Sequence, residues 1–441
     1  MIDSSSNFQK LLLKDGSAIE QVLSESDIEQ AWKSNSQELR LYLSKHLPRL
    51  IRIAFREDTN ELTLTALKML TGGNRFVIPN LVKSTYFPGF VTKTLAKAPE
   101  ISSSTIGRIC DVTLSIFQSG KTDILHSCGY ILMLLQYSNN PSVYSMFQTI
   151  LSDDNQKMEK FRDWIFNIGF IDEISSIILE CMNSTFLANN FVDSDLHSLH
   201  YTYDHEKLIN LLKLVSDAAK NRPEVKKDFI SSHLKSILIA SNSHRFPNCI
   251  SDHFWKVINT LYDSDLTLFF TDMAYAARSM IILTSKNSEN QVHLYLSESL
   301  DFISKIIESK PELVSNDLLE AILTLMGKFS RSSFFLCDVR RFFQKCITIK
   351  ELKEKIPSAI APKLLHYGKD KSNGLVSYFA IAIIEDMTKS ETAKKTIKKI
   401  DSISKFIKRT IDPLSKKREQ GYTDKYICKD TQTSPKRKSS I

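Results

Sequence analysis

Residues 15–46, DGSAIEQVLSESDIEQAWKSNSQELRLYLSKH, set the pattern that the rest of the chain repeats. Ser26, with Glu29 three residues later, has the form of a capping box at the start of a helix. Leu23 precedes this cap and can pack back onto the helix. A stripe with a spacing of three and four residues follows, formed by Ile28, Ala31, Trp32, Asn35, Leu39, Tyr42 and Leu43. The stretch therefore predicts an amphipathic helix with one apolar side.

Helical patterns of this kind continue along the chain, and no run shows the alternation of a strand. The clearest later patterns cover residues 204–220, 223–240, 251–262, 266–283, 290–309, 311–328, 338–348, 349–366 and 374–388. Short polar turns separate them, and two segments, 321–326 and 377–384, are apolar nearly all round, which indicates inner helices. Paired helices without a strict sequence period predict an all-α, irregular helical-repeat solenoid of the armadillo or HEAT kind. A compact all-α globule is the alternative.

The charge is unevenly distributed, although the net charge of the 441 residues is +8. Residues 389–441 hold sixteen Lys and Arg against six Asp and Glu, whereas residues 1–388 hold 42 and 44. We therefore expect a solenoid over residues 1–410 and a basic, disordered tail over 411–441. A nucleic-acid partner would have to bind this tail, and we do not expect one.

The sequence favours a cytoplasmic protein without a membrane partner. No run of eighteen apolar residues occurs, and the N-terminus MIDSSSNFQK lacks the features of a signal peptide. The seven scattered cysteines fit reduced, mostly buried thiols. In the tail, two basic clusters resemble a loose bipartite nuclear-import signal, and Ser434 lies in a form preferred by proline-directed kinases. The clusters are Lys416, Lys417, Arg418 and Lys436, Arg437, Lys438. Solvated charge is the alternative interpretation of both clusters.

Signatures of catalysis are missing from the sequence: there is no G-x-S-x-G, no H-E-x-x-H and no phosphate-binding loop. One cluster has the residue types that zinc uses, and it consists of Asp193, Asp195, His197, His200, Asp204 and His205. The segment is polar and lies between helical patterns, so a solvated surface loop is the better interpretation. We expect no metal, no cofactor and no enzymatic activity.

The opening stretch resembles the SAPS-domain family, the regulatory subunits of the type-6 serine/threonine protein phosphatase. The matching positions are Leu23, Glu25, Asp27, Ile28, Gln30, Lys33, Leu39, Tyr42 and Leu43. Three later strings match in order: Ala66 to Thr71 (ALKMLT), Lys121-Thr122-Asp123, and Asp163-Trp164-Ile165. The resemblance covers residues 15–182. The chain departs from the family at Ser36, where the family has Asn, and at its N-terminal tip, where one aromatic residue, Phe8, remains.

The resemblance implies an armadillo-like fold and a non-catalytic subunit that binds a type-6-like phosphatase catalytic subunit and directs it to substrates. Further adaptor proteins could join this complex. Four polar residues of the matching string, Glu25, Asp27, Gln30 and Lys33, are the expected partner contacts. Helix capping and a solvated face are their alternative roles. A karyopherin-like transport or cargo adaptor is the alternative function. The expected compartment is the cytoplasm, with a nuclear fraction if the basic clusters work as an import signal.

Overall fold

The computed structural model describes residues 4–13, 18–72, 80–81, 86–97, 101–119, 122–152, 158–188, 203–231, 248–288, 291–370 and 372–419. All regular elements within these ranges are helices, and none of these residues forms a strand. The predicted all-α class is confirmed for this part of the chain. The chain forms two compact units, Met1–Leu261 (unit 1) and Tyr262–Ile441 (unit 2).

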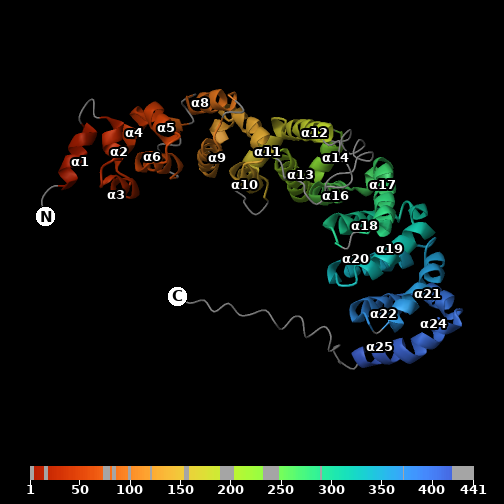
Figure 1. Ribbon diagram of the computed structural model, residues 1–441. Coiled ribbons are helices and arrows are strands. Elements are labelled where there is room, and N and C mark those ends of the chain that lie inside the picture. Colours follow the sequence, from red (N-terminus) through yellow and green to blue (C-terminus); the bar gives the residue numbers. More distant parts are fainter. Residues whose placement is uncertain are drawn as a thin grey trace. The chain divides into compact units, whose positions relative to one another are not determined.

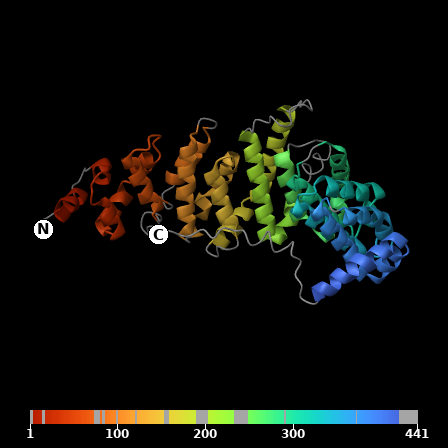
Figure 2. The ribbon, with the colours of Figure 1, turned by 60° about the horizontal axis from the view of Figure 1, so that its bottom comes forward.

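Unit 1 begins with short helices and continues as two layers (Figure 1). The short helices are α1 (Ser4–Leu13), α2 (Ile19–Leu23), α3 (Ile28–Lys33) and α4 (Gln37–Lys45). Successive neighbours in one layer are α6 (Glu61–Thr71), α9 (Ser103–Gln118), α10 (Pro141–Leu151), α13 (Tyr203–Asn221) and α16 (Asn248–Leu261). The other layer contains α5 (Leu47–Ala54), α8 (Tyr86–Leu95), η2 (Gly129–Tyr137), α12 (Phe170–Ala188) and α14 (Lys226–Ser231). Shorter elements are η1 (Thr122–Ser127), α11 (Glu159–Asn167) and η4 (Pro223–Val225). Figure 2 shows the long helices of this unit, coloured orange to yellow-green, side by side.

Unit 2 has the same two-layer packing. The first helices of successive pairs contact one another in one layer, which contains α17 (Thr267–Lys286), α19 (Asn316–Lys328), α21 (Lys355–Lys369) and α23 (Glu391–Lys398). The second helices form the other layer, with α18 (Leu294–Ile306), α20 (Ser333–Thr348) and α22 (Gly374–Lys389). The remaining elements are η6 (Ser264–Leu266), η7 (Pro311–Leu313), α24 (Asp401–Phe406), η8 (Ile407–Ile411) and α25 (Asp412–Glu419).

The apolar stripes of the helices face each other between the layers and form the core. Helix α19 shows this most clearly, since it contacts α17, α20 and α21 and leaves only a narrow side, with Asp317 and Glu320, exposed. Its buried residues are Leu318, Leu319, Ala321, Ile322, Leu323, Leu325 and Met326. The prediction that residues 321–326 belong to an inner helix is therefore confirmed.

The amphipathic helix expected after Ser26 is in fact two helices. Helix α3 ends in a Schellman motif, in which Ser36 N donates to Ala31 O at 2.9 Å and Asn35 N donates to Trp32 O at 3.1 Å. Asn35 has a φ of 62°, which Asn tolerates better than most residues. Ser36 then caps α4, because its hydroxyl accepts a hydrogen bond from Leu39 N at 3.3 Å.

The capping box expected at Ser26 does not form. The N-cap of α3 is Asp27, and its side chain makes no capping hydrogen bond. Glu29, the expected partner of Ser26, instead accepts a hydrogen bond from Lys68 on α6. A contact between distant segments has thus replaced the local one that the sequence pattern suggested.

Helical structure continues beyond residue 410, where the sequence predicted the start of a disordered tail. A π-helical turn, η8, leads into α25, and Pro413 lies in the first turn of α25. Proline lacks an N–H and is tolerated in the first turn of a helix, where that N–H would have no helical partner. The first basic cluster of the predicted import signal, residues 416–418, therefore lies in a helix.

Candidate functional site

The predicted contact residues lie on the short segment that contains α2 and α3. Glu25, Gln30 and Lys33 are exposed, and Asp27 is half-buried. Their side chains form no hydrogen bond with any other residue that the structure describes. The alternative role as a helix cap is thus excluded for the Asp27 side chain.

A shallow groove of about 390 Å³ lies beside this segment, between α3 and α6. One side of the groove carries an ion pair, in which Lys68 Nζ lies 2.8 Å from Glu29 Oε1. The hydrogen bond and the charge of Lys68 lower the pKa of Glu29, and the same contact raises the pKa of Lys68. Leu64 supplies an apolar surface and is 48% exposed. An apolar centre with a charged rim is the usual build of a small protein-binding surface.

Trp32 and Gly72 fix the position of α3 on α6. A Cβ atom at Gly72 would lie 2.8 Å from Trp32 Nε1 and 2.8 Å from the carbonyl oxygen of Lys68. The indole therefore occupies space that only glycine leaves open. Trp32 is half-buried, in agreement with its place in the apolar stripe of the sequence. The pair holds the exposed residues of α3 and the groove in one fixed arrangement.

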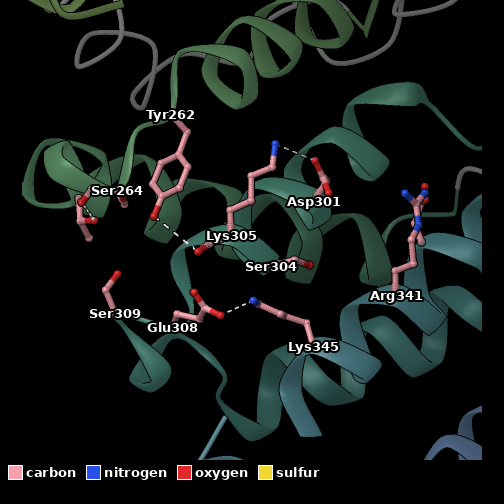
Figure 3. A pocket seen from close by; sticks show the side chains of 11 residues that line it. Tyr262, Ser264, Asp301, Ser304, Lys305, Glu308, Ser309, Arg341 and Lys345 are labelled. Carbon is pink, nitrogen blue, oxygen red and sulfur yellow. Dashed lines mark hydrogen bonds and ion pairs between the residues drawn. The ribbon is translucent and has the colours of Figure 1, made fainter. Parts of the chain in front are cut away.

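A second groove, of about 520 Å³, lies entirely within unit 2 (Figure 3). Its walls come from the start of unit 2 (Tyr262, Ser264, Thr267), from α18 and the turn after it, and from α20. Three ion pairs cross or border it: Lys305 with Asp301 at 3.1 Å, Lys345 with Glu308, and Arg341 with Asp338. Sequence reasoning missed this site, because no motif joins residues that are up to 83 positions apart.

The residues of the predicted metal cluster are only partly described. Asp193, Asp195, His197 and His200 lie outside the described residues. Asp204 belongs to α13, and His205 is buried in the same helix, whereas the sequence placed it at the end of a surface loop. Within the described part of the chain, no three His, Cys, Asp or Glu side chains gather in a way that could hold a metal ion.

Burial controls the chemistry of the thiols. It raises the pKa of Cys110 and of Cys128 to about 12, and it raises the pKa of Cys346 further. These three thiols therefore remain protonated at neutral pH, whereas a cysteine nucleophile needs a lowered pKa. Cys337, by contrast, is exposed.

The tail signals are described only at their start. Lys416 is exposed on α25, and Lys417 and Arg418 follow it in the same helix. Ser434, Lys436, Arg437 and Lys438 lie outside the described residues, so the import signal and the phosphorylation site stay predictions.

No helix among the described residues combines the length and the apolar character needed to cross a bilayer. No protein-family model and no curated protein matches this chain.

Proposed function

We propose that this protein is a non-catalytic scaffold that binds a type-6-like serine/threonine phosphatase catalytic subunit and directs it to substrates in the cytoplasm. The observation that carries the proposal is the exposure of Glu25, Gln30 and Lys33, together with the lack of hydrogen bonds from their side chains to other described residues. These residues belong to the string that resembles the SAPS-domain family, yet they are exposed and take no part in the described hydrogen bonding. A match at positions that folding does not require favours a role in binding a partner.

The packing within each unit supports a solenoid as the scaffold. In unit 2, α17 pairs with α18, α19 with α20 and α21 with α22, and each pair stacks on the next. An irregular armadillo-like or HEAT-like repeat has this arrangement. Each added helix pair extends the binding surface without requiring a new fold, which suits a protein whose task is to hold a globular enzyme.

The face around α3 and α6 is the contact that we propose for the catalytic subunit. Leu64 offers an apolar anchor, and the four carboxylates of this face, on Glu25, Asp27, Glu29 and Glu61, outnumber its two cations, on Lys33 and Lys68. Complementary charges steer association and select partners. The matching surface on the catalytic subunit should therefore present an apolar patch with basic residues around it.

Affinity capture of the full chain from cell extract, followed by mass spectrometry, tests the proposed partner. We expect a type-6-like phosphatase catalytic subunit in stoichiometric amounts. A Ran-type GTPase in its place would support the karyopherin-like alternative. Absence of any phosphatase subunit from the captured proteins would refute the proposal.

A further inference from the structure

The groove of unit 2 has no excess of charge with which to attract a phosphate or another anion. Its three cations, Lys305, Arg341 and Lys345, each pair with a carboxylate that also lines the groove. Figure 3 shows Lys305 beside Asp301 and Lys345 beside Glu308. A ligand must therefore compete with these pairs or use hydrogen-bonding groups that remain available.

The available groups are mainly acceptors, because the hydroxyl protons are already used. Ser304 donates to the carbonyl oxygen of Leu300 at 2.7 Å, and Ser309 donates to that of Ile306 at 3.0 Å. Thr267 likewise donates to the carbonyl oxygen of Ser264 at 2.6 Å. A hydroxyl that donates in this way still offers its lone pairs. The wall of the groove thus favours a ligand that brings hydrogen-bond donors.

Asp338 is the strongest acceptor in the groove. The residue is 7% exposed, and its Oδ2 is buried without a hydrogen-bond partner in the described part of the chain. Its Oδ1 accepts from Arg341, whose side chain is 68% exposed and so is held by little packing. Buried polar atoms are nearly always paired, and a buried carboxylate oxygen without a partner is costly. A second donor at Asp338 would remove that cost.

We propose that this groove binds an arginine side chain from an extended, hydrophilic segment of a partner protein. The incoming guanidinium takes the place of Arg341, which swings into solvent, and rotation of the Asp338 carboxylate brings the buried Oδ2 within reach of a second N–H of the ligand. Guanidinium fits this role better than ammonium because its planar fork matches a carboxylate with two parallel hydrogen bonds. A volume of about 520 Å³ has room for an arginine and its neighbouring backbone.

The test is a titration of the full chain with N-acetyl-arginine methylamide, followed by ligand-detected NMR. The citrulline analogue has the same shape without the charge and serves as the neutral control, and inorganic phosphate serves as the anionic one. We expect the arginine compound to bind and both controls to fail. Asp338→Asn should weaken its binding about tenfold or more, because a charge-assisted hydrogen bond is lost. Asp317→Asn, at an exposed position outside the groove, should leave binding unchanged.

Arg341→Gln gives the decisive result, because it removes the side chain that competes for Asp338. The proposal predicts tighter binding of the arginine compound by this variant than by the wild type. A merely structural role of the Asp338–Arg341 pair predicts no gain. Unchanged or weaker binding by Arg341→Gln would overturn the proposal, as would equal binding of the citrulline analogue or competition by phosphate. This variant also keeps the test valid if Asp338→Asn fails to fold.

Discussion

Asp386 on α22 lies at a buried junction with α20 and holds a network of hydrogen bonds. Arg340 Nε donates to its Oδ2 at 2.7 Å, Gln344 donates to the same atom at 2.8 Å, and Lys389 donates to Oδ1 at 2.9 Å. Burial alone would raise the pKa of this carboxyl, but the hydrogen bonds from Arg340, Lys389 and Gln344 together lower it. The folded state thus favours the charged form of Asp386.

The sign of the pH dependence follows from this lowered pKa. The contribution of Asp386 to stability is complete above the pKa of an unfolded Asp, about 3.9, and is lost as the pH falls through the lower folded value. We predict that Asp386→Asn lowers the unfolding free energy at pH 7 by about 2–4 kcal/mol. This is somewhat less than for fully buried pairs, since Lys389 is 66% exposed.

Urea unfolding at several pH values, followed by circular dichroism, measures this effect. The difference between wild type and Asp386→Asn should shrink below about pH 4. The control is Glu351→Gln, which removes one charge at an exposed position. If the difference in unfolding free energy between wild type and Asp386→Asn stays constant down to pH 2, the charge of Asp386 contributes nothing to stability.

Single residues also show what the sequence could predict about the site. The apolar stripe predicted that Trp32 packs, and Trp32 is half-buried, while Gly72 is the residue at which α6 ends. Their contact could not be predicted, because it depends on how α3 lies against α6. Asn35 looked like one position of a continuous stripe, and its left-handed conformation separates two helices instead.

At the level of elements, α4 provides a matched pair of leucines. Leu39 is fully buried, whereas Leu41, two residues along the same helix, is 57% exposed. We predict that Leu39→Asp unfolds the neighbouring helices, because an unpaired charge in the core costs roughly 4 kcal/mol or more. Leu41→Asp should be nearly neutral, because it places the charge in solvent.

Hydrogen exchange measured by mass spectrometry locates this effect. Peptides that cover α4 (Gln37–Lys45) and α5 (Leu47–Ala54) should lose protection in Leu39→Asp and keep it in Leu41→Asp. Equal protection in the two variants would mean that the side of α4 assigned to the core is wrong.

The existence of most helices was predictable from apolar spacing, but several helix types and ends were not. Apolar spacing does not distinguish the two 3₁₀ segments η1 (Thr122–Ser127) and η2 (Gly129–Tyr137) from an α-helix. The helix expected from Ile349 begins as α21 at Lys355, and α20 begins at Ser333 rather than at Asp338. Apolar spacing predicts a buried side, whereas caps, turns and packing partners decide where a helix begins.

At the scale of the whole chain, the division after Leu261 leaves no mark in the sequence. The segment between α16 and α17 is short, and the helical pattern continues across it. Which neighbouring helices pack together decides where one compact unit ends and the next begins, and the spacing of apolar residues does not contain this information. The groove of unit 2 was missed for the same reason, since α18 and α20 bring its carboxylates and cations together.

The central claim is that the α2–α3 segment contacts the catalytic subunit, and a charge reversal tests it. Asp27→Lys combined with Lys33→Asp keeps the net charge and changes two side chains that form no hydrogen bond in the described part of the chain. The melting temperature should therefore stay within a few degrees of the wild-type value, since surface changes cost within about ±0.5 kcal/mol. Lys350→Glu combined with Glu351→Lys is the matched control at another exposed pair.

The most direct measurement is a dissociation constant for the complex with the purified type-6-like catalytic subunit. It is measured for three forms of this protein: the wild type, the Asp27/Lys33 reversal and the control. Interface charges left without partners cost roughly 2–5 kcal/mol, so the reversal should weaken binding by about 30-fold or more. The control should bind like the wild type. Equal affinity of the reversal and the wild type would place the contact elsewhere on the protein, and no binding by the wild type would contradict the proposed function itself.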